Sequence, residues 1–226
     1  MTKINKFLIA LLISMGFATA SSALGLKIGT SAQLGFADAS GSESENSTVE
    51  SKATDNIFFG NYSFFVEKSL GFLPGPLSRL SVGYDFVPHD MGTGTAENVR
   101  TKSRNGGSGA IVAHNNRVKA NFSDFNTIYA TLNITDWLYL KAGTLSVDMT
   151  TKENLETGSS YGDAGLDGEM FGIGIEQSTD RMFFRVEGNW MDVDGVTLTS
   201  QTNSANTVTL DGIDTVSAKA SIGFKF

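Results

Sequence analysis

The chain has 226 residues, a net charge of −7 and no cysteine. Its acidity argues against a nucleic-acid partner, and the lack of cysteine excludes disulfide bonds as a source of stability. Glycine is abundant (25 residues) and proline is rare (3 residues), a composition that suits a folded chain of many strands and turns.

The first 23 residues have the pattern of a secretory signal peptide. Lys3 and Lys6 form a basic start, an apolar run covers residues 7–17, and small residues follow at Ala18 and Ala20. We expect cleavage after Ala20 or, with an equivalent small-residue pattern, after Ala23. The apolar run is shorter than the roughly 20 apolar residues of a spanning helix, and no later stretch approaches that length without a charge. We therefore expect an exported chain whose single domain covers residues 24–226, and we exclude a helical membrane protein.

Eight segments of that domain alternate between apolar and polar residues with a period of two, as half-buried β-strands do. In chain order they are residues 24–36, 58–67, 80–89, 127–134, 138–149, 171–176, 182–190 and 216–226. The fifth segment changes phase: Leu138, Leu140 and Ala142 are apolar at even positions, but Leu145 and Val147 are apolar at odd ones. A β-bulge near Gly143 would explain that change.

The connections between these segments alternate between long and short. Residues 38–54, 91–116, 151–167 and 197–208 are long and polar, whereas residues 72–76, 135–136 and 178–180 are tight turns by their Pro, Gly and Asp content. An even number of strands with short turns at one end and long loops at the other predicts an all-β, eight-stranded antiparallel up-and-down transmembrane β-barrel. A further hairpin in the second loop, residues 91–116, would make ten strands.

A membrane barrel turns its apolar face to lipid and its polar face to the lumen. Aromatic residues such as Phe36, Phe58 and Trp190 lie near the ends of the apolar faces, where membrane interfaces favour them. A lysine facing lipid at mid-bilayer costs about 2–4 kcal/mol, so Lys219 must face the lumen. The same rule predicts an internal network of four cations and four anions: Lys27, Glu67, Asp85, Lys141, Glu176, Arg185, Glu187 and Lys219. Because eight strands enclose little more than side-chain volume, we expect these charges to pair and to plug the lumen.

The signal peptide, the eight alternating segments and the ending Phe224-Lys225-Phe226 resemble a small Gram-negative outer-membrane β-barrel of the OmpA-transmembrane, OmpX and Opa type. The resemblance covers the whole chain after the signal and implies an outer-membrane location, periplasmic termini, four surface loops, and contact with outer-membrane lipid and lipopolysaccharide. It also implies that Phe224 and Phe226 act as membrane anchor and as the signal read by the barrel-assembly machinery. The sequence departs from full OmpA-type proteins because no peptidoglycan-binding domain follows Phe226.

Some barrels of this size modify lipid A with a histidine near the outer rim. Here His89 falls on the phase that we expect to face the lumen, and His114 lies in a predicted loop. A His–acid pair such as His89 and Asp90 can orient an imidazole as a general base. However, no nucleophile motif surrounds either histidine, so we assign no catalytic residue.

The predicted loops differ in charge. The second is basic through Arg100, Lys102 and Arg104, which suit a contact with lipopolysaccharide phosphates. The other loops are acidic, and fragments such as residues 192–195 and 163–169 have part of the spacing of a Ca²⁺ loop without completing one. We interpret these charges as solvated surface and expect neither a metal nor a cofactor.

Three hypotheses about function follow. The first is a non-enzymatic structural or surface-interaction protein with a charge-paired lumen. The second is a porin for small hydrophilic solutes, suggested by the Gly- and Ser-rich inner face. The third is a lipid A-modifying enzyme built around His89.

Overall fold

The computed structural model describes residues 25–45, 48–93, 96–102, 109–156 and 158–226. The predicted signal peptide, residues 1–23, lies outside the described residues. The strands are β1 (Leu26–Glu45), β2 (Thr48–Ser69), β3 (Leu80–Phe86), β4 (Met91–Gly92), β5 (Ala96–Lys102), β6 (Val112–Asn133), β7 (Leu138–Asn154), β8 (Ala164–Ser178), β9 (Met182–Thr199) and β10 (Thr207–Lys225). A short 3₁₀ helix, η1 (Gly75–Arg79), lies in the turn before β3. Within this part of the chain, no helix is long and apolar enough to cross a membrane.

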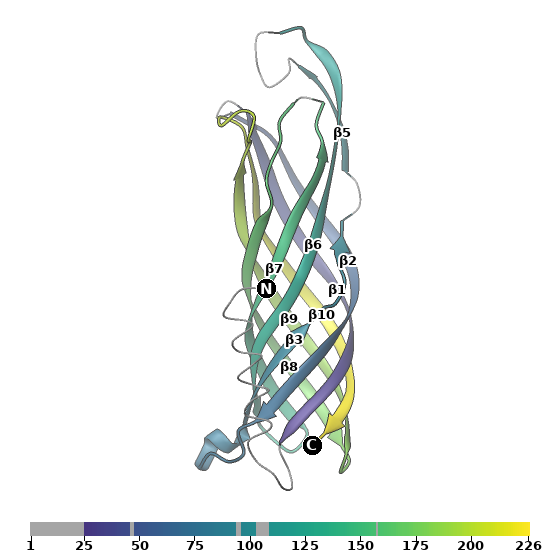
Figure 1. Ribbon diagram of the computed structural model, residues 1–226, viewed down its shortest axis with the longest axis vertical. Helices are drawn as coiled ribbons and strands as arrows, with labels where there is room; N and C mark the ends of the chain where they lie inside the picture. Colours follow the sequence, from purple (N-terminus) through teal and green to yellow (C-terminus); the bar gives the residue numbers. More distant parts are fainter. Residues whose placement is uncertain (1–24, 46–47, 94–95, 103–108, 157) are drawn as a thin grey trace.

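The strands form one closed antiparallel ring with eight positions (Figure 1). Neighbours in sequence pair around the ring from β6 through β10, β10 pairs with β1, and β1 pairs with β2. The ring closes through β3, which pairs with β2 on one side and with β6 on the other. β4 and β5 add no further position, because both continue along β6 above β3. The predicted eight-stranded up-and-down barrel is therefore confirmed.

Most of the predicted long loops are strand rather than loop. β1 and β2 pair up to Glu45 and Thr48, inside the predicted loop 38–54. The predicted loop 91–116 contains β4, β5 and the start of β6, and the β5–β6 hairpin rises above the other strands (Figure 1). The short turns are confirmed, and they lie at the end of the barrel that holds η1 and the C-terminus. We call this the short-turn end and the opposite one the long-loop end.

The expected bulge at Gly143 is wrong. β7 pairs with β8 from Leu138 to Met149 without a shift of register, so its odd-numbered residues point inwards along the whole strand. The irregularity lies in the neighbouring β6, between Ser123 and Asn126, where Asp124 has a φ of 52°. The apolar residues of β7 change face because the barrel interior itself changes from polar to apolar above Gly143.

The outer surface carries an apolar band with a sharp upper limit. On β1 the outward residues are apolar or neutral up to Phe36, and Asp38 is the next outward residue. For a rise of ~3.4 Å per residue and a tilt of ~40°, the stretch from Leu26 to Phe36 spans about 26 Å along the barrel axis, close to the ~25 Å expected of a bilayer-spanning barrel. Above the band, acidic residues occupy directly opposed positions on four neighbouring strands: Asp38, Asp214, Asp192 and Glu169.

Candidate functional site: an ion-pair layer beneath an apolar cavity

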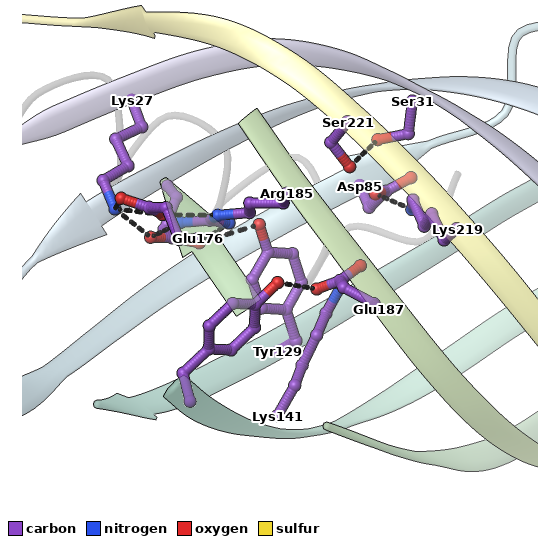
Figure 2. Close-up of polar contacts among 12 residues, drawn as sticks. Lys27, Ser31, Asp85, Tyr129, Lys141, Glu176, Arg185, Glu187, Lys219 and Ser221 are labelled. Carbon is purple, nitrogen blue, oxygen red and sulfur yellow. Dashed lines mark hydrogen bonds and ion pairs between the residues drawn. The ribbon is translucent and has the colours of Figure 1, made fainter. Parts of the chain in front are cut away.

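The barrel interior at the level of the apolar band is filled by charged side chains. All eight predicted lumen charges point into it, and they come from seven strands: Lys27 on β1, Glu67 on β2, Asp85 on β3, Lys141 on β7, Glu176 on β8, Arg185 and Glu187 on β9, and Lys219 on β10. We call this set the ion-pair layer (Figure 2). Strand alternation places it, because each member occupies an inward position of its strand.

Arg185 is the centre of the lower part of the layer. Its two terminal nitrogens donate to the two carboxylate oxygens of Glu67 at 2.7 Å each, a bidentate pair, and its Nε donates to Glu176 at 2.6 Å. Lys27 donates to both carboxylate oxygens of Glu176 at 2.7 and 2.8 Å and lies 3.7 Å from Glu67. The planar, five-donor guanidinium is suited to holding two carboxylates at once. This part of the layer therefore links β1, β2, β8 and β9 across the lumen.

Two tyrosine rings extend across the lumen beside these pairs. The Tyr139 hydroxyl donates to Glu187 at 2.7 Å, and Lys141 lies 3.4 Å from the same carboxylate. Lys141 also sits 4.1 Å from the centroid of the Tyr129 ring. Inward glycines make the room: a Cβ added at Gly83 would collide with the Tyr129 ring, and one at Gly174 with the Tyr139 ring. The glycines of the inner face thus accommodate large side chains rather than line a channel.

The top of the layer closes the lumen. Lys219 donates to Asp85, and the pocket that these two residues line together with Gln33, Thr127 and Asn189 has a volume of about 10 Å³. That space is no larger than the ~10–15 Å³ that a single water molecule requires. Hydrogen bonds between Ser31 and Ser221 at 2.9 Å and from Gln33 to Ser217 at 2.8 Å tie β1 to β10 at the same level (Figure 2 shows the serine pair).

The layer is electrically balanced and almost fully buried. Six of its eight members expose 8% or less of their side chains, and Lys27 and Glu176 expose 17% and 13%. Removing one partner of such a pair leaves a buried charge unpaired and costs about 3–5 kcal/mol. Every carboxylate in the layer already accepts from a cation, and among the described residues no group of three or more His, Asp or Glu side chains could hold a metal ion.

Above the layer the interior becomes apolar and hollow. A cavity of about 560 Å³ is lined by Ile57, Phe59, Phe122, Met149, Val193 and Ile213, among others. Its wall continues into a packed cluster that includes Leu145, Val147 and Met191. On β7 and β9 these residues occupy the same inward phase as Lys141 and Glu187 below them. The sequence analysis missed this cavity, although the apolar residues at odd positions after Gly143 were its signal.

The other predicted residues lie apart from the layer. His89 does not face the lumen as expected: its ring packs on the outward Tyr62 ring, with centroids 4.5 Å apart. His114 lies in β6 rather than in a loop, and it is buried. Arg100 and Lys102 belong to β5, opposite His114 and Val112 of β6, whereas Arg104 lies outside the described residues. Phe224 and Phe226 face outwards, 54% and 56% exposed, and Phe226 pairs with Leu26 through both backbone groups.

A closed eight-position ring, an outer apolar band about as tall as a bilayer and a charged interior occur together in one kind of protein. The fold is that of a small outer-membrane β-barrel. No family model matches this sequence, and no curated protein does. Among solved structures, the fold is similar to that of the attachment invasion locus protein Ail of Yersinia pestis, with 12% identity over 88% of this chain and 98% of that one, and a TM-score of 0.39.

Two further solved structures show the same general likeness. The outer membrane protein OprG of Pseudomonas aeruginosa has 11% identity over 88% of this chain and 95% of that one, with a TM-score of 0.44. The outer membrane protease OmpT of Escherichia coli has 10% identity over 92% of this chain and 99% of that one, with a TM-score of 0.43. At such identities the likeness concerns the fold alone.

Proposed function

We propose that this protein is a non-enzymatic outer-membrane barrel that works at the extracellular surface and conducts no solute to the periplasm. The observation that carries the proposal is the ion-pair layer, in which Glu67, Arg185 and Glu176 join opposite walls of the barrel. A hydrophilic solute would have to break these buried pairs, and the space left beside Asp85 and Lys219 is about 10 Å³. The layer thus stabilises the barrel and closes it.

In this proposal the short-turn end is periplasmic and the long-loop end is extracellular, as in other barrels with this loop pattern. The basic hairpin of β5 and β6, with Arg100 and Lys102, would contact lipopolysaccharide phosphates. The acidic residues above the apolar band, such as Asp192 and Asp214, keep the remaining outer wall hydrated.

The surroundings of His89 support a non-enzymatic role. Its Nε2 accepts the backbone N–H of Tyr62 at 3.4 Å, and its Nδ1 lies 3.2 Å from the backbone oxygen of Asp90. Both ring nitrogens are therefore engaged by backbone groups, without a carboxylate to orient the ring or a nucleophile to activate, within the part of the chain that the structure describes.

Single-channel recording in planar bilayers tests the closed lumen. We expect wild-type protein to leave the bilayer at its background conductance. The quadruple variant Arg185→Ser/Glu67→Ser/Lys219→Ser/Asp85→Ser removes two cations and two anions together, so it opens space at both levels of the layer without changing its net charge, and we expect it to produce discrete conducting steps. Wild-type steps as large as those of the quadruple variant would contradict the proposal and favour the porin hypothesis.

We also propose that Phe226 is part of the assembly signal. Its outward ring and its backbone pairing with Leu26 would present the end of β10 to the barrel-assembly machinery during export. Phe226→Ser should lower the amount of folded, heat-modifiable barrel in the outer membrane. Phe72→Ser is the control, because Phe72 is also an exposed phenylalanine, 70% against 56% for Phe226, and it lies in a short turn. Equal amounts of folded barrel from the two variants would refute this role.

A further inference from the structure

The apolar cavity has no role in a barrel that is only structural. We propose that it binds one acyl chain of a single-chain lipid, which enters from the outer leaflet through a gap in the barrel wall between β2 and β4. The inference goes beyond the proposed function, because a closed lumen neither requires nor excludes a ligand above the layer.

The shape and chemistry of the cavity suit a hydrocarbon chain. Its volume of about 560 Å³ lies within the ~300–1,000 Å³ of typical ligand sites. On β9 its lining runs from Met191 to Leu198, which corresponds to about 18 Å along the barrel axis at a rise of ~3.4 Å and a tilt of ~40°. The ion-pair layer forms its floor. A long, narrow, apolar space that is closed at one end matches an extended chain better than a compact hydrophilic solute.

The wall of the barrel is not hydrogen-bonded all the way up. β2 pairs with β3 only from Phe64 to Ser69. Above this level β4 and β5 take the place of β3 beside β6, and both pair with β6. Among the described residues, no backbone pairing joins the upper part of β2 to β4 or β5. The gap between them opens where the chain leaves β2 after Phe86 and continues along β6.

This gap begins within the apolar band. Tyr62 and Phe58 are the outward residues of β2 beside it, and they are 50% and 62% exposed. Phe58 lies opposite Phe36, the last outward apolar residue of β1 before Asp38. The lower part of the gap therefore faces the outer leaflet of the bilayer, and the side chains that reach through it, Asn61 and Met91, also line the cavity.

Among the described residues, contacts that involve side chains bridge the gap at this level. The His89 ring lies on the Tyr62 ring and accepts the backbone N–H of Tyr62 at 3.4 Å, and Asn61 Nδ2 lies 3.6 Å from the sulfur of Met91. The Asn61 amide oxygen is buried and has no hydrogen-bond partner. Such an acceptor costs free energy unless a donor reaches it. We assign the missing donor to the head group of the bound lipid. The head group therefore carries a hydroxyl or a protonated carboxyl group.

Binding can be measured with cis-parinaric acid, a fluorescent fatty acid, added to wild-type barrel in phospholipid vesicles. Two substitutions on β6 form a matched pair. Ala120 lines the cavity, so Ala120→Trp fills it, whereas Ala130→Trp adds the same ring to the exposed outer face. We expect saturable binding by wild type and by Ala130→Trp, and binding at least about tenfold weaker, ~1.4 kcal/mol, by Ala120→Trp. Gel heat-modifiability checks folding, and Val147→Phe replaces Ala120→Trp if that variant does not fold.

Saturable binding that is equal in the filled and control variants would overturn the site, as would fluorescence no greater than that of protein-free vesicles. Neither result bears on conductance. A result that refutes the lipid site therefore leaves the proposed closed lumen untouched, and the two can be told apart.

The route is tested by closing the gap with Tyr62→Cys/His89→Cys, whose two thiols are the only ones in the chain. The protein is folded first and then oxidised. We expect loading from vesicles to be lost in the oxidised protein and restored by a reductant, while loading of detergent-solubilised protein from water persists. Loading from vesicles that is unaffected by the cross-link would refute the lateral route. Failure of the two thiols to join would contradict the contact between Tyr62 and His89.

Discussion

The two halves of this barrel use the same strands with opposite chemistry. In the half near the short turns, outward residues such as Val186 are apolar and inward residues such as Arg185 are charged. In the half near the long loops, outward Asp192 is charged and inward Val193 is apolar. All four lie on β9 without a change of side-chain phase. The lower half is therefore built like a membrane barrel, and the upper half like a water-soluble barrel that encloses an apolar pocket.

The difference follows from the solvent outside each half. Lipid around the lower half requires an apolar exterior, and the polar side chains that remain must then satisfy one another inside. Water around the upper half accepts a polar exterior, and the hydrophobic effect then favours apolar side chains inside. The comparison teaches that alternation identifies a strand, whereas the solvent at each level decides which face is inner.

The ion-pair layer should show the largest effect. Arg185→Leu removes the bidentate cation of Glu67 and leaves Glu176 with Lys27 alone, so it should lower the free energy of unfolding by about 3–5 kcal/mol in urea titrations of vesicle-embedded protein. Arg181→Leu, an exposed arginine in a turn, is the control and should change it by no more than about 0.5 kcal/mol. Adding Glu67→Gln to Arg185→Leu should recover part of the loss. Equal effects of Arg185→Leu and Arg181→Leu would mean that the layer does not hold the lower half together.

Two lysine substitutions on the outer face of β9 test the change of solvent. Val186→Lys places a charge against lipid near mid-bilayer and should cost about 2–4 kcal/mol. Asp192→Lys lies three outward positions further up, in water, opposite Asp214 and Glu169, so it should leave the free energy of unfolding unchanged or raise it by up to about 1 kcal/mol. The same urea titration measures both. Equal costs would place both residues in one solvent and remove the boundary between the halves.

The tyrosine rings of the lower half should contribute less than its ion pairs. Tyr139→Phe removes the hydroxyl that donates to Glu187 at 2.7 Å, and a hydrogen bond to a charged group is worth about 1.5–3 kcal/mol. Tyr62→Phe is the control, because Tyr62 lies on the exposed outer face. If both variants unfold at the same urea concentration, the buried hydroxyl does not support the layer.

The smallest effect should be a stabilisation in the upper half. Asp214 lies directly opposite both Asp38 and Asp192, and like charges in opposed positions repel each other. Asp214→Asn should therefore raise the free energy of unfolding by about 0.2–1 kcal/mol at low salt, with a smaller gain at high salt because salt screens exposed charges. Asp180→Asn, in a short turn, serves as the control. A loss of stability at low salt would indicate a favourable role for the acidic row.

The sequence predicted the lower half well, because there the alternation and the cost of charge in lipid both apply. Those two arguments placed all eight charges on the inner face, from Lys27 to Lys219. They failed above the bilayer, where Leu145, Val147 and Met149 were taken to change face when only the solvent had changed. The position of His89 was missed for another reason: after Phe86 the chain leaves β2 and continues along β6, and no local pattern in the sequence records that loss of a partner.

A site-directed spin-label scan of β7 tests the central claim most directly. The chain has no cysteine, so single cysteines at residues 138–150 can each carry one label, and accessibility to oxygen and to a water-soluble nickel complex can be compared. Our account predicts that even positions change from oxygen-accessible at Leu140 and Ala142 to nickel-accessible at Asp148, while odd positions stay inaccessible throughout. Oxygen-accessible labels at Leu145, Val147 and Met149 would show that the strand changes face at Gly143, and would contradict a barrel whose interior turns from charged to apolar.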